Sequence, residues 1–135
     1  MARPMTVLIV DDDAGMRLTL RMIVEREGHT VLVASDGPGA LAVAEQSPFD
    51  IAFVDYKMVG MNGGDTCAAL HRLRPDAALH VMTAHVSSEA GNAALAGGAT
   101  GILFKPLDVD EMLRLIAARA DGAPHPAPQA EDGGR

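Results

Sequence analysis

Acidic, hydroxyl and lysine side chains each follow a short apolar run of this sequence. Three aspartates at 11–13 follow the first run, and Asp55 follows the third. Thr83 follows the fourth run and Lys105 follows the fifth. Crowded carboxylates repel one another, and with water they make a hard-oxygen site that suits Mg²⁺. A lysine ammonium and a threonine hydroxyl opposite a metal could hold a phosphoryl group, with Asp55 as the carboxylate nucleophile. The residue types therefore favour phosphoryl transfer through an aspartyl-phosphate.

These residues meet only if the apolar runs are strands of one sheet. Runs typical of buried strands alternate with segments of helical periodicity along the chain. Strict alternation predicts an α/β fold, a doubly wound parallel sheet with helices on both faces. In such sheets ligands bind at the carboxyl ends of the strands, where the polar residues lie. The expected strands are 6–10, 30–34, 51–54, 79–82 and 101–104, and the expected helices are 14–27, 38–46, 65–73, 87–96 and 108–120, with a glycine-rich loop at 60–64.

Each of these polar residues also has an ordinary explanation. The aspartates at 11–13 could cap the following helix and complement its dipole. Asp55 and Thr83 could be turn residues, and Lys105 could be a solvated lysine. All of these explanations would have to hold together at one edge of one sheet. The convergence of the residues, rather than any one of them, indicates a site.

Composition argues against several classes of protein. The chain has 135 residues, enough for one core, and its 18 acidic residues outnumber its 11 basic ones. This balance argues against a basic surface for nucleic acid, and the scarcity of aromatic residues argues against a base-stacking platform. No apolar run reaches the roughly 18 residues that span a bilayer, and no basic-then-apolar leader opens the chain. With the single cysteine, Cys67, as a core residue, we expect a cytoplasmic protein that contacts neither membrane nor nucleic acid directly.

The last part of the chain has a different composition. Residues 122–135 combine three prolines with small and polar residues and show no apolar period. Such a segment is typical of a disordered tail or of the stub of a linker. We therefore expect the folded domain at 1–121 and a proline- and alanine-rich tail or linker stub at 122–135.

Five motifs carry a family resemblance. In chain order they are VLIVDDD at 7–13, DIAFVDYKM at 50–58, MNGG at 61–64, MTA at 82–84 and FKP at 104–106. Their order and spacing resemble the receiver domain of bacterial two-component response regulators, the CheY-like family, over about residues 5–120. The resemblance implies a flavodoxin-like, five-stranded sheet in the order 2-1-3-4-5 with five flanking helices. It also implies a phosphorelay signalling protein, a phosphoacceptor with at most intrinsic autophosphatase activity rather than an enzyme.

The resemblance assigns roles to the residues at the acidic end. Asp55 would accept a phosphoryl group from the phosphohistidine of a sensor histidine kinase or a histidine phosphotransfer protein. Asp12 would bind Mg²⁺ directly and Asp11 partly through water. Asp55 and the backbone carbonyl of Lys57 would be further metal ligands, so that phosphorylation would depend on magnesium.

The remaining implied roles concern switching and output. Thr83 would move toward the phosphoryl group, and Lys105 would pair with it beside a cis Lys105–Pro106 peptide bond. Asp13 would cap the first helix. The output would be binding to a downstream protein target, through a surface around the fourth helix, the fifth strand and the fifth helix.

Two positions depart from the common pattern of the family. Val59 stands where many receivers carry proline, which changes the stiffness of a loop but no reacting group. Ile102 stands where many carry a tyrosine or phenylalanine whose rotation reports phosphorylation. We therefore expect a different or weaker rearrangement around the fourth helix, with Ile102 as an apolar contact of the partner surface.

Two residues flank the path of a water that would attack an acyl phosphate. Lys57 lies two residues past Asp55, and His85 lies two residues past Thr83. Both could be ordinary exposed side chains. Alternatively, they shield or hydrogen-bond the acyl phosphate and set its lifetime.

Other functions fit the sequence less well. A Mg²⁺-dependent phosphatase that uses an aspartyl-phosphate needs a carboxylate two residues after the nucleophile, where Lys57 stands. A nucleotide-binding module needs the GxGxxG spacing after the first strand, which the glycines at 97–101 do not supply. A receiver-like protein-binding scaffold without phosphorylation is opposed by the intact Asp55, Thr83 and Lys105. The chain could be a stand-alone receiver or phosphorelay carrier, or a fragment of a longer regulator or hybrid kinase.

Overall fold

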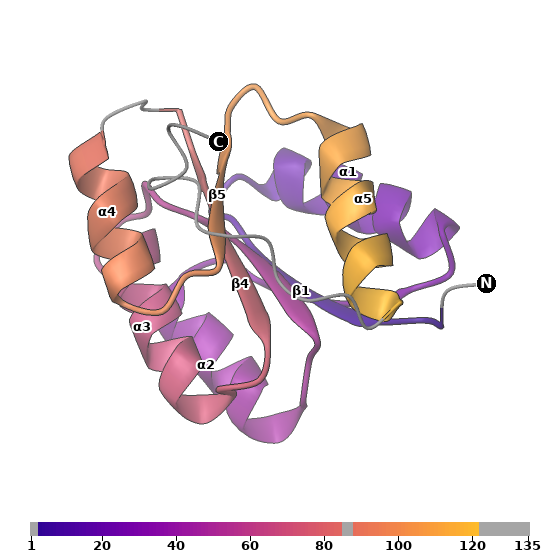
Figure 1. Ribbon diagram of the computed structural model, residues 1–135, viewed down its shortest axis with the longest axis horizontal. Coiled ribbons are helices and arrows are strands. Elements are labelled where there is room, and N and C mark those ends of the chain that lie inside the picture. Colours follow the sequence, from indigo (N-terminus) through magenta and orange to yellow (C-terminus); the bar gives the residue numbers. More distant parts are fainter. Residues whose placement is uncertain (1–2, 85–87, 122–135) are drawn as a thin grey trace.

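Short strands alternate with helices along residues 3–84 and 88–121, the part of the chain that the computed structural model describes (Figure 1). The strands are β1 (Thr6–Val10), β2 (Thr30–Ala34), β3 (Ile51–Asp55), β4 (Ala78–Thr83) and β5 (Gly101–Phe104). The helices are α1 (Ala14–Arg26), α2 (Gly37–Gln46), α3 (Gly63–Leu73), α4 (Ser88–Ala96) and α5 (Val109–Ala120). The strands pair in parallel in the order β2-β1-β3-β4-β5, which confirms the predicted doubly wound α/β fold. The predicted tail at 122–135 lies outside the described residues.

The side chains of β1 alternate between the two faces of the sheet, as the pleat of a strand requires. Val7 and Ile9 pack in one core with residues of α1 and α5. Leu8 and Val10 pack in a second core with residues of α2, α3 and α4. Figure 1 shows the same two layers of helices on opposite sides of the sheet. Because both faces are covered, the strand is apolar at nearly every position, which explains its continuous apolar run.

The register of the strands brings their last residues to one edge of the sheet. Asp55 at the end of β3 pairs with Met82, and Thr83 at the end of β4 pairs with Phe104. The Asp11 amide donates a hydrogen bond to the carbonyl oxygen of the last residue of β2, at 3.2 Å, and so extends the pairing past the end of β1. The residues that directly follow the strands are therefore held almost as firmly as the strands themselves.

Helix α3 begins two residues earlier than predicted. A glycine-rich loop was expected here, but Gly63 and Gly64 form the first turn of the helix. Asn62 caps it, since its side chain accepts a hydrogen bond from an amide of the first turn at 2.8 Å. A Cβ at Gly63 would lie 2.5 Å from the Tyr56 Cα and 2.6 Å from the Asp55 carbonyl oxygen. Glycine is needed here for the close approach of α3 to the end of β3, not for a flexible loop.

The side chain of Cys67 lies in α3 and is fully buried. Burial raises the pKa of its thiol to about 12, so the group stays protonated at neutral pH. Since the thiolate is the reactive form, this cysteine has no means of acting as a nucleophile in the folded state. Its predicted role as a core residue is confirmed.

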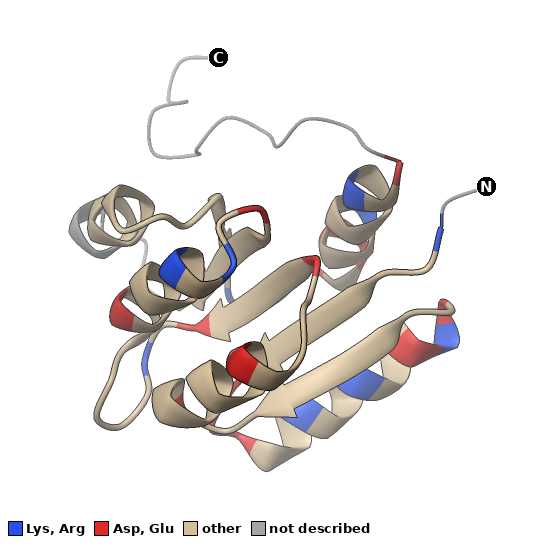
Figure 2. Ribbon diagram, turned by 90° about the horizontal axis from the view of Figure 1, so that it is seen from below, with Lys and Arg blue, Asp and Glu red and all other residues tan. Residues whose placement is uncertain are grey.

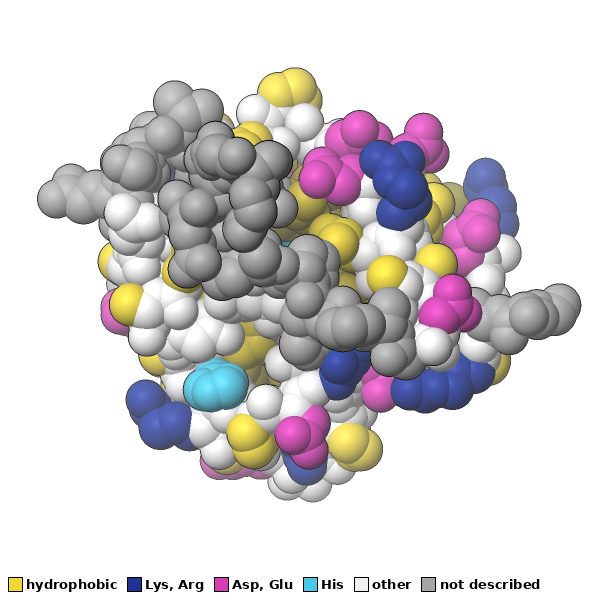
Figure 3. Space-filling view, in the orientation of Figure 1, with side chains coloured by type: hydrophobic (Ala, Val, Ile, Leu, Met, Phe, Trp, Pro, Cys, Tyr) yellow, Lys and Arg dark blue, Asp and Glu magenta, His cyan; other side chains and the backbone are white. Residues whose placement is uncertain are grey.

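The described surface carries charges of both signs. On the face shown in Figure 3, lysine and arginine side chains lie next to acidic ones along the rim. On α1, Arg21 and Glu25 form an exposed ion pair one helical turn apart, with 3.0 Å between Nε and Oε2. Within residues 3–84 and 88–121, no helix combines the length and the apolar character needed to cross a membrane.

Candidate functional site

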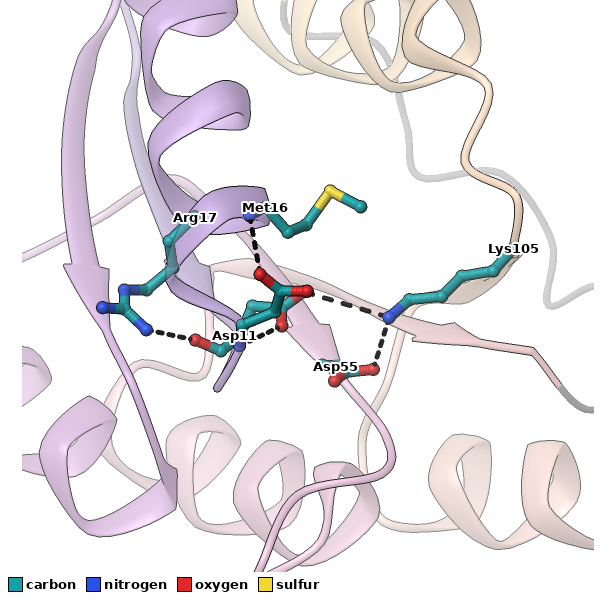
Figure 4. Close-up of polar contacts among 6 residues, drawn as sticks. Asp11, Met16, Arg17, Asp55 and Lys105 are labelled. Atoms are coloured by element: carbon teal, nitrogen blue, oxygen red, sulfur yellow. Dashed lines mark hydrogen bonds and ion pairs between the residues drawn. The ribbon is translucent and has the colours of Figure 1, made fainter.

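Residues at the ends of four strands lie at the carboxyl edge of the sheet (Figure 2), and Figure 4 draws Asp11, Asp55 and Lys105 from three of these ends. Asp11 directly follows β1, and Asp55 is the last residue of β3. Thr83 is the last residue of β4, and Lys105 directly follows β5. The structure therefore places these four residues at the edge that the sequence predicted, because the strands of a parallel sheet all end on the same side.

Three carboxylates form the acidic centre of this edge. Asp11, Asp12 and Asp55 each offer one oxygen, and these oxygens lie within 4.8 Å of one another. Asp11 is 1% exposed and Asp55 is 5% exposed, whereas Asp12 lies at the surface. Negative charges this close, two of them out of water, oppose folding unless a positive charge is near.

Lys105 supplies a positive charge to two of these carboxylates (Figure 4). Its Nζ lies 3.1 Å from Asp55 Oδ1 and 3.9 Å from Asp11 Oδ2. Its backbone amide donates a hydrogen bond to the Thr83 carbonyl oxygen at 2.8 Å, which ties the exit of β5 to the end of β4. The Lys105–Pro106 peptide bond is cis, as the family resemblance implied.

The backbone and one oxygen of Asp11 are held by hydrogen bonds. Its Oδ1 accepts a hydrogen bond from the Asp13 amide at 2.9 Å. Its carbonyl oxygen accepts one from Nη1 of Arg17, also at 2.9 Å (Figure 4). The sequence reasoning missed Arg17. The signal that could have found it is its place one helical turn after Asp13, where a side chain returns to the start of the helix.

The second oxygen of Asp11 has no hydrogen bond. Asp11 Oδ2 is buried and accepts none, and the ammonium of Lys105 is 3.9 Å away. Burial raises the pKa of Asp11, and the negative charges of Asp55 and Asp12 raise it further. The hydrogen bond from the Asp13 amide and the charge of Lys105 act in the opposite direction. The negative charges of the three carboxylates therefore exceed the single positive charge of Lys105 around Asp11 Oδ2.

The donor set of this site fits a hard divalent cation. A buried carboxylate oxygen without a hydrogen bond, a second buried carboxylate and a third at the surface are close enough to share one ion. Ligands of this kind suit Mg²⁺ and Ca²⁺, which prefer several oxygens and retain water where the site is open. Asp11, Asp12 and Asp55 are the candidate metal ligands among residues 3–84 and 88–121.

The other predicted residues lie around this centre. Asp13 caps α1 as predicted, since its side chain accepts a hydrogen bond from an amide of the first turn at 3.1 Å. Thr83 is 4% exposed at the end of β4. The Lys57 side chain is exposed, and Val59 is 89% exposed in the same loop. His85 lies outside the described residues.

The prediction that Ile102 supplies an apolar contact to a partner is wrong. Its side chain is 8% exposed and packs under α4, where a Cβ on Gly91 would lie 2.6 Å from Ile102 Cδ1. Gly91 lets the helix come this close, and the contact hides the isoleucine. Phe104 is 46% exposed and lies two residues further along β5, on the same face of the strand. The apolar group that β5 presents to solvent is therefore Phe104.

Comparison with known proteins gives a consistent result. A family model for the response regulator receiver domain matches residues 7–117. The transcriptional regulatory protein TcrA of Mycobacterium tuberculosis is 31% identical over 128 residues, which cover 95% of this chain and 51% of that protein. The nitrate/nitrite response regulator protein NarP of Escherichia coli is 36% identical over 124 residues, which cover 90% of this chain and 58% of that protein. The chain thus spans about half the length of these curated relatives.

Two solved structures extend the comparison. A CheY-like response regulator receiver domain protein from Methanospirillum hungatei matches with a TM-score of 0.83 and 29% identity, over 98% of this chain and 100% of that one. A response regulator protein from Burkholderia pseudomallei matches with a TM-score of 0.78 and 30% identity, over 87% of this chain and 69% of that one. That second structure holds a phosphorylated aspartic acid, a calcium ion and citrate.

Replacing Asp11 with asparagine measures the electrostatic cost of the site. Asp11→Asn removes the buried charge and keeps an oxygen to accept the hydrogen bond of the Asp13 amide. Because the pKa of Asp11 is raised in the folded state, its charged form opposes folding at neutral pH, and protonation at lower pH relieves this. Without divalent cations, we expect Asp11→Asn to raise Tm at neutral pH by roughly 3 °C, equivalent to about 1 kcal/mol in a domain of this size.

Thermal unfolding in EDTA, followed from about pH 7 to about pH 4, checks this expectation. The advantage of the variant should shrink as the pH falls, and added Mg²⁺ should stabilise only the wild type. Asp36→Asn is the matched control, because Asp36 caps α2 at the surface and asparagine caps equally well. An Asp11→Asn variant that is less stable than the wild type in EDTA at neutral pH would contradict the electrostatic argument.

Proposed function

The chain belongs to the response regulator receiver domain family of two-component signalling, and we propose that Asp55 is its phosphoacceptor. One observation carries this proposal. The Asp55 carboxylate ends the central strand of the sheet, with Nζ of Lys105 at 3.1 Å and oxygens of Asp11 and Asp12 within 4.8 Å. A buried carboxylate between a lysine and an acidic metal site combines a nucleophile with the two kinds of charge that stabilise a transferring phosphoryl group.

Transfer to Asp55 exchanges one bond of phosphorus for another. A carboxylate oxygen of Asp55 attacks the phosphorus of a phosphohistidine, and a P–O bond forms. The P–N bond breaks, and the imidazole leaves with its electron pair. Lys105 offsets the charge on the phosphoryl oxygens during transfer, and the hydroxyl of Thr83 holds the product from the neighbouring strand. The donor is a sensor histidine kinase or a histidine phosphotransfer protein.

We propose that Asp11, Asp12, Asp55 and the backbone carbonyl of Lys57 hold Mg²⁺ during this transfer. The buried oxygen of Asp11 without a hydrogen bond supports this assignment. When bound, the ion offsets negative charge on the attacking carboxylate and on the phosphoryl oxygens. The related response regulator from Burkholderia pseudomallei carries a phosphorylated aspartic acid and a calcium ion, the same pairing of an acyl phosphate with a divalent cation.

The output that we propose is a change in a protein-binding surface. The receiver domain would extend over 1–121, with 122–135 as a tail or linker stub, and it would bind a downstream protein rather than nucleic acid. Since the curated relatives are about twice as long, a stand-alone receiver, a phosphorelay carrier and the receiver part of a longer regulator all agree with the match. Slow hydrolysis of its own acyl phosphate is the only catalytic activity that we assign to the chain.

Intact mass after incubation with acetyl phosphate and Mg²⁺ tests the phosphoacceptor. We expect the wild type to gain the mass of one phosphoryl group, because the site supplies the nucleophile and both kinds of positive charge. Asp55→Asn should gain none, and the wild type should gain none in EDTA. Asp76→Asn, an exposed aspartate before β4 at the far edge of the sheet, is the matched control and should react normally. If no donor labels the wild type, including a phosphorylated histidine kinase, the chain is a receiver-like scaffold without phosphorylation.

The lifetime of the acyl phosphate tests the role proposed for Lys57. Its exposed side chain follows Asp55 by two residues, so it can shield the phosphoryl group from water. We expect the adduct of Lys57→Ala to decay about threefold faster after the donor is removed, a barrier change of about 0.6 kcal/mol. His85→Ala is expected to act in the same direction. Arg72→Ala, an exposed cation in the last turn of α3, is the control. An unchanged decay rate in both variants would assign Lys57 and His85 to the solvated surface.

The packing of Ile102 under α4 tests how phosphorylation reaches the output surface. We propose that movement at the ends of β4 and β5 passes to α4 through the contact between Ile102 and Gly91. In backbone amide NMR spectra, α4 signals of the wild type should shift on phosphorylation, and in Ile102→Ala these shifts should fall below about half. Ile23→Ala on α1 is the matched control for truncation of an isoleucine. Wild-type spectra that are identical around β5 and α4 with and without phosphorylation would show that this surface does not respond.

A further inference from the structure

A cavity of about 290 Å³ lies at the opposite, amino edge of the sheet. Its walls come from the segment before β3, from the end of α3 and the segment that follows it, and from the last turn of α5. Asp50 directly precedes β3, and Ala77 directly precedes β4. The length of β3 therefore separates the cavity from Asp55, which is roughly 16 Å for five strand residues. The phosphoacceptor chemistry makes no use of this cavity.

Three of the four charged side chains that line the cavity donate or accept hydrogen bonds with the backbone, and the fourth, Asp76, is exposed. Arg74 donates through Nε and Nη2 to the Ala44 carbonyl oxygen at the end of α2, at 3.0 and 2.7 Å. Asp50 Oδ2 accepts a hydrogen bond from the Thr6 amide at 2.8 Å. Arg119 donates to a backbone carbonyl oxygen of the segment between α3 and β4. These three side chains hold the walls together, and the Asp76 carboxylate lies at the exposed side of the wall, where water can solvate it.

The rest of the wall is apolar and partly open to solvent. Pro48, Phe49, Leu73 and Pro75 all line the cavity. Leu73 is 39% exposed although it ends an amphipathic helix, and both prolines lie at the surface. Aromatic and proline walls of this kind suit proline rings, which are apolar and belong to a backbone that loses little conformational entropy on binding.

We propose that this cavity binds the segment 122–135 of the chain itself, through its prolines. The segment carries Pro124, Pro126 and Pro128. Arg119 lines the cavity and precedes the first of these by five residues. Helix α5 ends at Ala120 with Asp121 as its C-cap, so the reach is counted from Asp121. An extended chain covers at most about 10 Å in the three residues to Pro124, and each further pair adds about 7 Å. All three prolines can therefore reach the cavity from the end of α5.

Tethering favours this occupant over a separate molecule. A short flexible connection gives an effective concentration in the millimolar range, so a contact with a dissociation constant of about 1 mM is already substantially populated within one chain. A second copy of the chain, or another protein, would need a comparable free concentration or a larger interface. A cavity that accommodates only one or two proline rings suits a weak contact within the chain.

Docking at this edge would set the direction in which the chain leaves α5. The docked segment would run back along the amino edge of the sheet, away from the carboxyl edge that holds Asp55. Docking and phosphorylation would therefore be independent, and each can fail without the other.

A spin label on the full chain tests the proposal. Gln129→Cys places a single reactive thiol beyond the prolines, because Cys67 is fully buried and its thiol is protonated at neutral pH. A nitroxide at this position should remove at least half of the amide signal intensity at Phe49, Leu73 and Ala77. Amides at the carboxyl edge should keep their intensity.

Two changes separate docking from the mere presence of a nearby tether. Replacing Pro124, Pro126 and Pro128 together by serine keeps the length of the tether and removes the rings. Leu73→Ser removes an apolar wall, and Leu18→Ser, at a 59% exposed site on α1, is its matched control. Docking predicts that the serine triple variant and Leu73→Ser regain the lost intensity and that Leu18→Ser does not.

Three results would overturn the proposal. An equal loss of intensity in the serine triple variant would mean that the tether passes the cavity without binding. No loss at the cavity in the parent chain would mean that the segment lies elsewhere. In a mixed sample, one set of chains carries the NMR isotopes and the other set carries the spin label. If the isotope-labelled chains lose amide signal intensity at the cavity, the occupant is a second copy of the chain. The three prolines lie outside the described fold, so the serine triple variant still tests the proposal if Leu73→Ser does not fold. Acetyl phosphate labelling of the same samples reports separately on Asp55.

Discussion

Two carboxylates lie buried side by side at the end of a parallel sheet, and the surrounding structure has to offset the repulsion between them. Asp11 directly follows β1 and Asp55 is the last residue of the neighbouring strand β3, so the sheet itself holds them together. Repulsion between such charges is strong because little water screens it. Lys105 is shared between them at 3.9 and 3.1 Å, and one cation does not neutralise two anions and a third at the surface. The remaining negative charge would make the site attract the divalent cation that we propose and, with it, a phosphoryl group.

The fold also offsets this charge through the helices that start at the same edge. In a sheet of this kind every crossover helix begins where a strand ends, so the positive ends of α1 and α3 lie at the carboxyl edge. Asp13 and Asn62 cap these two helices and fix where they begin. Gly63 brings α3 against the peptide that follows Asp55, and Arg17 brings the first turns of α1 onto the Asp11 carbonyl. The apolar cores on both faces pack the helices against the sheet that carries these residues.

The strand order was implied by the family resemblance. The sequence itself was sufficient for the α/β class, the edge at which the residues meet and the cap of α1. These features follow from alternation of elements and from residues directly after strands, which are local patterns. The start of α3 was missed because a glycine pair usually signals a loop, and only the close approach to Tyr56 explains it. The burial of Ile102 depends on Gly91 of a helix that precedes β5, and a contact between two elements leaves no local pattern. The cavity at the amino edge is lined by three segments that are separate in the sequence, so no local motif predicts it.

The shared position of Lys105 indicates where a change of charge becomes a change of shape. A phosphoryl group on Asp55 adds negative charge and strong acceptors on one side of this lysine. β1 and β3 have neighbours on both sides, and Arg17 holds the exit of β1, so these strands resist displacement. β5 is an edge strand with β4 as its only partner in the sheet, and the amide of Lys105 is bonded to the end of β4. Because Ile102 lies between β5 and α4, we propose that a shift of Lys105 toward the phosphoryl group would move this edge strand and the helix packed on it. Such a path would follow from the position of β5 at the edge of the sheet, and it would not require an aromatic ring at position 102.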